Sequence, residues 1–61
     1  MTPSFVASDG TKICLYDRAE LKNGRKGAVV EIFSETNECI VDFDDEDFDS
    51  VKMKDILKKI V

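Results

Sequence analysis

The sequence predicts an all-β fold, a small barrel built from short antiparallel strands. Between Tyr16 and Phe43, two segments in which apolar and polar residues alternate are joined by turn residues, a pattern typical of a β-hairpin. The chain has 61 residues, of which 43% are hydrophobic, as expected for one small globular domain. A domain of this size buries only about 60% of the surface that its unfolded chain exposes. We therefore expect marginal stability.

The first fifteen residues are expected to form an N-terminal arm or an extra hairpin, before a barrel over residues 16–61. Asp9-Gly10 lies between short apolar runs at 5–7 and 13–15. Asp-Gly favours a hairpin, because both central residues of a type I′ turn need a positive φ. The alternative is a loose arm, since residues 2–4 are turn-like and chain termini often fray.

Three strands are expected in the first part of the barrel, at about 13–22, at about 26–34 and at 39–43. Asn23-Gly24 ends the first strand, and Gly27 opens the second. One face of the second strand is wholly apolar and the inward set of the third is also apolar, so we assign both sets to the core. These core residues are Ala28, Val30 and Ile32 in the second strand, and Val41 and Phe43 in the third.

The C-terminal segment allows two interpretations. We expect a fourth strand at about 49–54 and then a short helical turn at about 55–60, because several apolar residues recur there at helical spacing. These residues are Met53, Ile56, Leu57, Ile60 and Val61. The alternative is one longer helix capped by Ser50.

The segment YDRAELKNGRKGAVVEIF, followed by CIVDF and SVKMKDI, resembles a family of short, uncharacterised bacterial proteins with an SH3-like barrel. The resemblance covers roughly residues 16–60 and implies the SH3-like fold. Its motifs occupy turn and core positions, so it implies no particular activity. The first fifteen residues are additional to the family pattern, and Ala19 replaces a larger β-branched residue. The positions that carry the resemblance are Asp17, Gly24, Gly27, the strand from Val29 to Ile32, Asp55 and Ile56.

Cys14 and Cys39 are the only cysteines, and they lack the two-residue spacing of metal ribbons and redox motifs. We expect both to be small buried or half-buried apolar residues without a bond, with a Cys14–Cys39 disulfide as the alternative. The N-terminus has neither a basic start nor a long apolar segment, so we expect no signal peptide, no membrane association and a cytoplasmic location.

The residue types argue against catalysis. The chain contains no histidine, which removes Ser-His and Cys-His nucleophile pairs and the commonest zinc ligand. Gly24-x-x-Gly27 lacks the Gly-Lys-Ser/Thr ending of a phosphate loop and is expected to be a tight turn with positive φ. We therefore expect a protein that is not an enzyme and that uses no cofactor and no metal. Two interpretations remain for the nearby cations Lys22, Arg25 and Lys26. They belong to a solvated loop, or they bind a phosphate or an acidic partner.

Residues 42–49 hold six of the thirteen acidic residues of the chain. The segment fits a calcium loop poorly, because no glycine and no bidentate carboxylate follow at the required positions. The other interpretations are a catalytic carboxylate pair, a solvated loop and a surface that recognises a basic partner, with Phe43 or Phe48 as an aromatic anchor. Because the carboxylates should repel one another, we expect replacement of Asp45 and Asp47 by Asn to leave the fold intact or slightly stabilised. The candidate partner-binding residues are Asp42, Asp44, Asp45, Glu46, Asp47, Phe48 and Asp49.

The formal net charge of −4 opposes non-specific binding to nucleic acid. The function expected from the sequence is therefore a small non-enzymatic protein-interaction module whose partner is a protein with a basic surface. One alternative is an acidic inhibitor from a phage or mobile element that mimics DNA. Another is a nucleic-acid-binding barrel that uses the basic turn and the C-terminal lysines. A homodimer is a further expectation.

Overall fold

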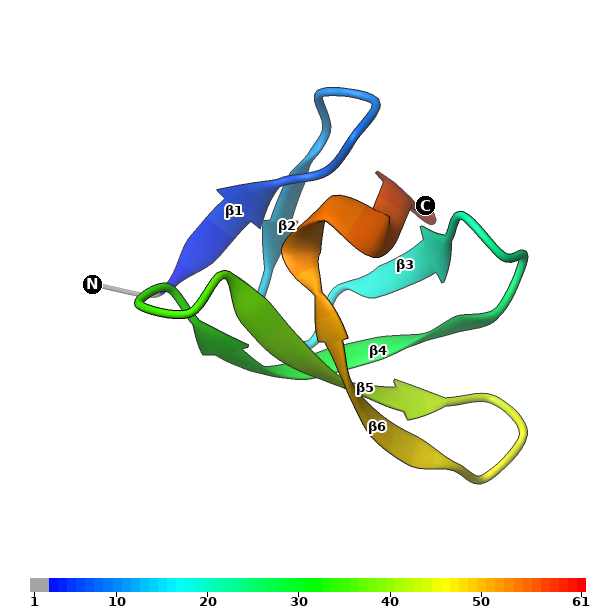
Figure 1. Cartoon of the computed structure of the whole chain (residues 1–61). Coiled ribbons are helices and arrows are strands. Elements are labelled where there is room, and N and C mark those ends of the chain that lie inside the picture. Colours follow the sequence, from blue (N-terminus) through cyan, green and yellow to red (C-terminus); the bar gives the residue numbers. More distant parts are fainter. Residues whose placement is uncertain (1–2) are drawn as a thin grey trace.

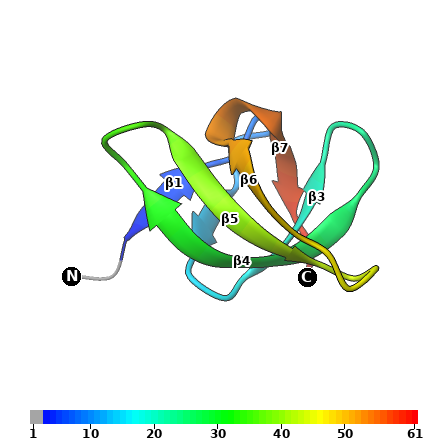
Figure 2. The same ribbon diagram turned by 60° about the horizontal axis from the view of Figure 1, so that its bottom comes forward.

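The computed structural model of the chain describes residues 3–61, which form seven β-strands and one 3-10 turn (Figure 1). The first two residues of the predicted N-terminal segment lie outside this range. The strands form a two-stranded antiparallel sheet, β1-β2, and a five-stranded antiparallel sheet in the order β6-β5-β4-β3-β7 (Figure 2). The all-β prediction is confirmed. The elements are β1 (Ser4–Val6), β2 (Lys12–Cys14), β3 (Arg18–Leu21), β4 (Lys26–Phe33), β5 (Glu38–Phe43), β6 (Phe48–Lys52), the 3-10 turn η1 (Met53–Asp55) and β7 (Ile56–Lys59).

Strands β4 and β5 form the predicted hairpin at the centre of the larger sheet. The chain turns between them at residues 34–37, where Asn37 adopts a φ of 57°. Asn tolerates this left-handed conformation better than most residues. Val41 and Phe43 are buried as predicted, and Cys39 joins them on the same inward face.

A β-bulge in β4 contradicts part of the predicted core. The register with β5 shifts between Val29 and Glu31, so Val30 is an extra residue in its strand. A bulge reverses the inward and outward alternation that follows it. Val29 is therefore buried before the bulge and Ile32 after it, whereas Ala28 and Val30 are only half-buried.

The predicted first strand over residues 13–22 is interrupted by a tight turn. Tyr16 has a φ of 69°, and the Asp17 carboxylate accepts a hydrogen bond of 2.8 Å from the backbone N–H of Cys14. The turn sends the two halves into different sheets. The first half, β2, pairs with β1, and the second half, β3, joins the larger sheet.

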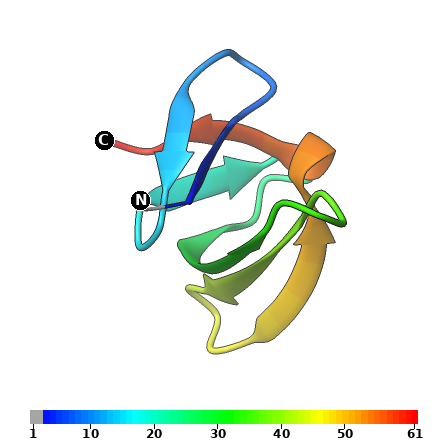
Figure 3. The same cartoon turned by 90° about the vertical axis from the view of Figure 1, so that its left-hand side faces the viewer.

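The N-terminal hairpin covers one edge of the larger sheet. Figure 3 shows the blue hairpin beside the red C-terminal strand β7, away from the gold strand β6. Ile13 of β2 is fully buried in the same core cluster as the larger sheet, so the hairpin packs within its own chain. Hydrogen bonds of 3.0 or 3.1 Å run from Ser8 N to Ile56 O, from Asp9 N to Leu57 O, and from Lys59 N to the Thr11 hydroxyl.

The predicted C-terminal helix over residues 55–60 is wrong. Only η1 is helical, and the next four residues form strand β7, which pairs with β3. Ile56 is completely buried at the start of β7. Pairing with β3 on one edge and hydrogen bonds from the N-terminal hairpin on the other hold these residues as a strand, which outweighs a helical pattern too short to be stable alone.

The buried side chains form one apolar cluster between the two sheets. No buried polar side-chain atom within residues 3–61 lacks a hydrogen-bond partner. Phe5, Leu15, Val51 and Met53 pack against the cluster from its margin. The cluster consists of Ala7, Ile13, Ala19, Leu21, Val29, Ile32, Cys39, Val41, Phe43 and Ile56.

The two cysteines are free and differ in exposure, so we predict that they differ in reactivity. Burial raises the pKa of the Cys39 thiol from 9.0 to about 11, which lowers its thiolate population about a hundredfold. Cys14 is only half-buried. In the native protein, a thiol reagent should modify Cys14 well before Cys39, as measured by mass spectrometry of proteolytic fragments. Modification of both at one rate would contradict this assignment.

Candidate functional site

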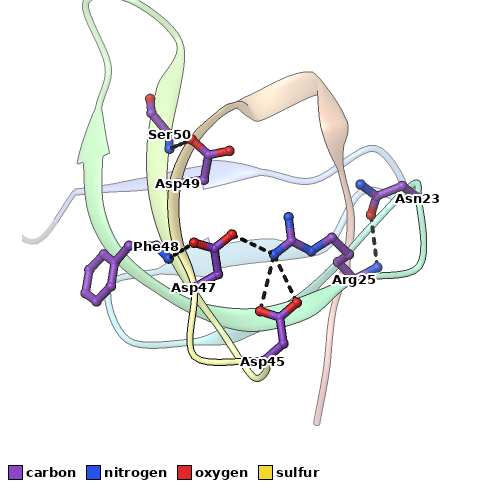
Figure 4. Close-up of polar contacts among 7 residues, drawn as sticks. All are labelled: Asn23, Arg25, Asp45, Asp47, Phe48, Asp49 and Ser50. Carbon is purple, nitrogen blue, oxygen red and sulfur yellow. Dashed lines mark hydrogen bonds and ion pairs between the residues drawn. The ribbon is translucent and has the colours of Figure 1, made fainter.

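A basic turn and an acidic turn meet at one end of the larger sheet. The basic turn joins β3 to β4, and it is closed by a hydrogen bond of 2.8 Å from Leu21 N to Arg25 O. Gly24 has a φ of 91°, as predicted for this turn, and the side chain of Asn23 accepts the backbone N–H of Arg25 at 2.9 Å. These contacts fix the backbone of Arg25 and direct its side chain toward the acidic turn between β5 and β6 (Figure 4).

Arg25 joins the two turns through three contacts. Its guanidinium carbon lies 3.7 Å from the centre of the Phe43 ring, which is a cation–π contact. Its Nη2 lies 3.2 Å from the Asp45 carboxylate and 3.3 Å from that of Asp47. Figure 4 shows both carboxylates turned toward this guanidinium. The arrangement neutralises part of the acidic turn from within the molecule.

A second arginine pairs with the acidic turn from strand β3. Arg18 donates two hydrogen bonds to Asp44, of 2.8 and 2.6 Å, in the bidentate geometry that suits a guanidinium and a carboxylate. The hydrogen bonds from Arg18 lower the pKa of Asp44, and the same bonds raise the pKa of Arg18. Both groups therefore remain charged at neutral pH.

Half of the candidate carboxylates thus have cationic partners, which changes one expectation. Asp44, Asp45 and Asp47 form ion pairs with arginines. Replacing Asp45 and Asp47 by Asn would remove attraction to Arg25 as well as repulsion among the acids. We therefore no longer expect this change to stabilise the fold. Exposed ion pairs are worth only about 0–1 kcal/mol each, so the loss should also be small.

The other candidate residues do not all share one face of the sheet. Phe48 and its cross-strand partner Asp42 lie on the same face, and we call these two residues together with Glu46, two residues before Phe48, the Phe48 surface. Asp49 is paired with the buried Val41 and therefore points to the opposite face. Among the described residues, the carboxylates of Asp42, Glu46 and Asp49 form no ion pair within 4.0 Å. Glu46 lies in the acidic turn with a φ of 67°, and Asp42 is the cross-strand partner of Phe48.

Phe48, and not Phe43, is available as an anchor for a partner. Phe43 is only 3% exposed and belongs to the core, whereas Phe48 is 64% exposed. In Figure 4 the Phe48 ring points away from Arg25 and its carboxylates. The half-buried Ile40 is the diagonal neighbour of Phe48 on the same face of the sheet, so the ring extends an existing apolar area.

A groove of about 530 Å³ lies near the turn between β4 and β5, apart from the predicted site. Its wall includes Phe33, which is 43% exposed, and two carboxylates, Glu35 and Glu38. Glu38 is ion-paired with Lys52 at 3.3 Å. Hydrogen bonding from Thr36, and then from Lys52, lowers the pKa of Glu38. No local sequence pattern indicates this groove, because its lining comes from β4, the turn that follows it, β5 and β6. Its lining residues are Ile32, Phe33, Ser34, Glu35, Thr36, Glu38 and Ser50.

Within residues 3–61, no three or more carboxylate or cysteine side chains are grouped so that they could hold a metal ion. The same part of the chain contains no helix with the length and apolar character needed to cross a membrane. Comparisons of the chain with protein families, curated proteins and solved structures found no match.

Proposed function

We propose that this chain is an SH3-like small barrel that acts, without catalysis, as a protein-interaction module. The order of its features supports the barrel: five antiparallel strands, joined in turn by a basic turn, a polar turn, an acidic turn and η1. The exposed residues support the interaction role, because β6 presents a large aromatic side chain, Phe48, opposite the carboxylate of Asp42.

The partner that fits the Phe48 surface is a protein with a basic surface. The carrying observation is the 64% exposure of Phe48, whose cross-strand partner is Asp42 and which follows Glu46 by two residues in the sequence. Aromatic side chains often supply the energetic centre of an interface, and charges at its rim mainly raise the association rate. The ring would therefore provide affinity, while the two carboxylates would attract lysine and arginine side chains.

The nucleic-acid alternative is less well supported, because several of its cations already have partners. Arg25 contacts two carboxylates of the acidic turn. Lys58 lies 3.9 Å from Glu20, and Lys59 lies 3.7 Å from Asp17. Binding a phosphate backbone requires a cluster of cations that are not already neutralised.

A binding measurement with two matched aromatic variants tests the proposal. The probe is a short peptide rich in arginine and leucine, and a peptide of the same length rich in glutamate and leucine is the control. Phe48→Ser should weaken binding of the basic peptide about tenfold or more, because it removes the anchor. Phe33→Ser removes another exposed ring, outside the Phe48 surface, and should leave the affinity unchanged.

Salt dependence measures the contribution of the carboxylates. The double change Asp42→Asn and Glu46→Gln should slow association of the basic peptide, and the difference from wild type should shrink as salt is added. Equal effects of Phe48→Ser and Phe33→Ser, or equal binding of both peptides, would contradict the proposed surface.

A further inference from the structure

One carboxylate links Arg25 to the start of strand β6. Asp47 Oδ2 lies 3.3 Å from Nη2 of Arg25, and Asp47 Oδ1 accepts the backbone N–H of Phe48 at 2.9 Å (Figure 4). Because a carboxylate is planar, its two oxygens cannot move independently of each other. The guanidinium and the backbone of Phe48 are therefore joined through a single rigid group.

The Arg25 end of this link is held from several sides. The backbone N–H of Arg25 is bonded to the Asn23 side chain at 2.9 Å, and its carbonyl accepts the N–H of Leu21 at 2.8 Å. Its guanidinium lies over the ring of Phe43, which is buried in the core. The core thus holds the cation in place, and the cation in turn holds one oxygen of Asp47.

The Phe48 end lies where the acidic turn becomes a strand. The Phe48 ring is 64% exposed, so packing restrains it little. Phe43 and Asp47 form a hydrogen-bonded pair, since the N–H of Phe43 donates to the Asp47 carbonyl at 2.7 Å. The next pair of an antiparallel ladder is not hydrogen-bonded. This next pair is Asp42 and Phe48, so the N–H of Phe48 faces away from β5 and donates to the Asp47 carboxylate instead.

We propose that Arg25 is a positioning residue for Phe48. Acting through the Asp47 carboxylate, it holds the backbone at Phe48 in place, so that the ring is already oriented when the basic partner arrives. Fixing an anchor before binding raises the affinity, because less conformational freedom is lost in the complex. This inference rests on the function proposed for the Phe48 surface, and it adds a residue that acts on that surface from within the molecule.

Charge and positioning predict opposite effects for the same substitution. Arg25→Gln removes a cation from beside the acidic turn. By charge alone, the variant should bind a basic peptide more tightly than the wild type does. If Arg25 positions Phe48, the variant should instead bind the arginine- and leucine-rich peptide about three- to tenfold more weakly. The direction of the change therefore separates the two roles.

Arg18→Gln is the matched control, because it removes the same charge from the other arginine of this site. Both oxygens of its partner Asp44 accept hydrogen bonds from Arg18 itself, so this pair does not extend to Phe48. The control should bind the basic peptide at least as tightly as the wild type. In an Asp47→Ala background, which interrupts the link, Arg25→Gln should no longer weaken binding.

The free protein gives a readout that requires no partner. Nuclear magnetic resonance relaxation measures the order parameter of each backbone amide. Arg25→Gln and Asp47→Ala should both move the order parameter of the Phe48 amide from the range of a rigid backbone, about 0.85, toward that of a flexible one, below about 0.6. The Ser50 amide is the internal reference, because its N–H is bonded at 2.9 Å to a different carboxylate, that of Asp49. Its order parameter should not change, and circular dichroism checks that both variants are folded.

Three results would overturn the proposal. Arg25→Gln and Asp47→Ala could both leave the order parameter of Phe48 at its wild-type value in a folded protein. Arg25→Gln could bind the basic peptide as tightly as Arg18→Gln does. It could also weaken binding equally in the Asp47→Ala background, which would show that Arg25 does not act through Asp47. If the wild type itself does not bind the basic peptide, the proposed function is wrong, and the order parameters alone decide whether Arg25 positions Phe48.

Discussion

Phe43→Ala should unfold the protein or bring it to the limit of stability. Its ring is 3% exposed, in a core cluster of only ten residues. Replacing a buried Phe by Ala costs about 3–5 kcal/mol, whereas a domain of this length is expected to have a total stability of roughly 3–9 kcal/mol. The change also removes the surface on which Arg25 rests, so the basic and acidic turns lose one of their shared contacts.

Phe48→Ala is the matched control, because it removes the same side chain from an exposed position in the next strand. It should change the free energy of unfolding by less than about 1 kcal/mol. Urea denaturation followed by circular dichroism measures both variants. Similar midpoints for Phe43→Ala and Phe48→Ala would contradict the strand register described above.

Gly27→Ala should be the other strongly destabilising change. A Cβ at this position would meet backbone atoms of β5, lying 2.8 Å from the Phe43 Cα and closer still to the Asp42 carbonyl oxygen. Backbone atoms of a paired strand cannot move aside without breaking the register. Overpacking in a core typically costs about 1–3 kcal/mol, and we expect this change to exceed that range.

Gly24→Ala provides the control within the same Gly-x-x-Gly motif. At Gly24 a Cβ would find no atom within 4 Å, but the φ of 91° is unfavourable for alanine. This cost is about 1–2 kcal/mol. The sequence-based interpretation of both glycines as positive-φ turn residues is thus correct for Gly24 only. A larger loss of stability from Gly24→Ala than from Gly27→Ala would contradict the close approach of β4 to β5.

Local patterns were sufficient to predict the hairpins. Alternating apolar residues and turn residues identified β4 and β5, and Asp9-Gly10 identified the N-terminal hairpin. In that hairpin only Gly10 has a positive φ, so its turn is not the type I′ turn expected. Whether residues 1–15 and 16–61 form separate units stays a prediction, although Ala7 and Ile13 share one core cluster with the larger sheet.

The remaining errors concern contacts between distant parts of the chain. The bulge at Val30 depends on the register with β5, which alternation within one strand cannot reveal. The C-terminal helix was predicted from apolar spacing, yet pairing with β3 made residues 56–59 a strand. In both cases the competing interaction came from a neighbouring strand.

The sequence predicted the candidate site as one acidic segment. It did not predict that two arginines of the same chain form ion pairs with half of the carboxylates in that segment. Arg25 is 20 and 22 residues from its two carboxylates in sequence, and Arg18 is 26 residues from Asp44. No spacing pattern in the sequence indicates ion pairs between residues this far apart. The basic turn and the acidic segment can each be recognised in the sequence, but only the antiparallel pairing of β4 with β5 brings them together.

Mapping the contact of the basic peptide by nuclear magnetic resonance tests the proposed interaction role most directly. Backbone amide shifts would be recorded for the isotope-labelled protein during titration with the arginine- and leucine-rich peptide. We predict that the largest changes occur at Asp42 and across residues 46–49, and that Phe48→Ser abolishes them while the fold is retained. Saturable binding whose largest changes lie elsewhere, for example around Phe33, would contradict the account.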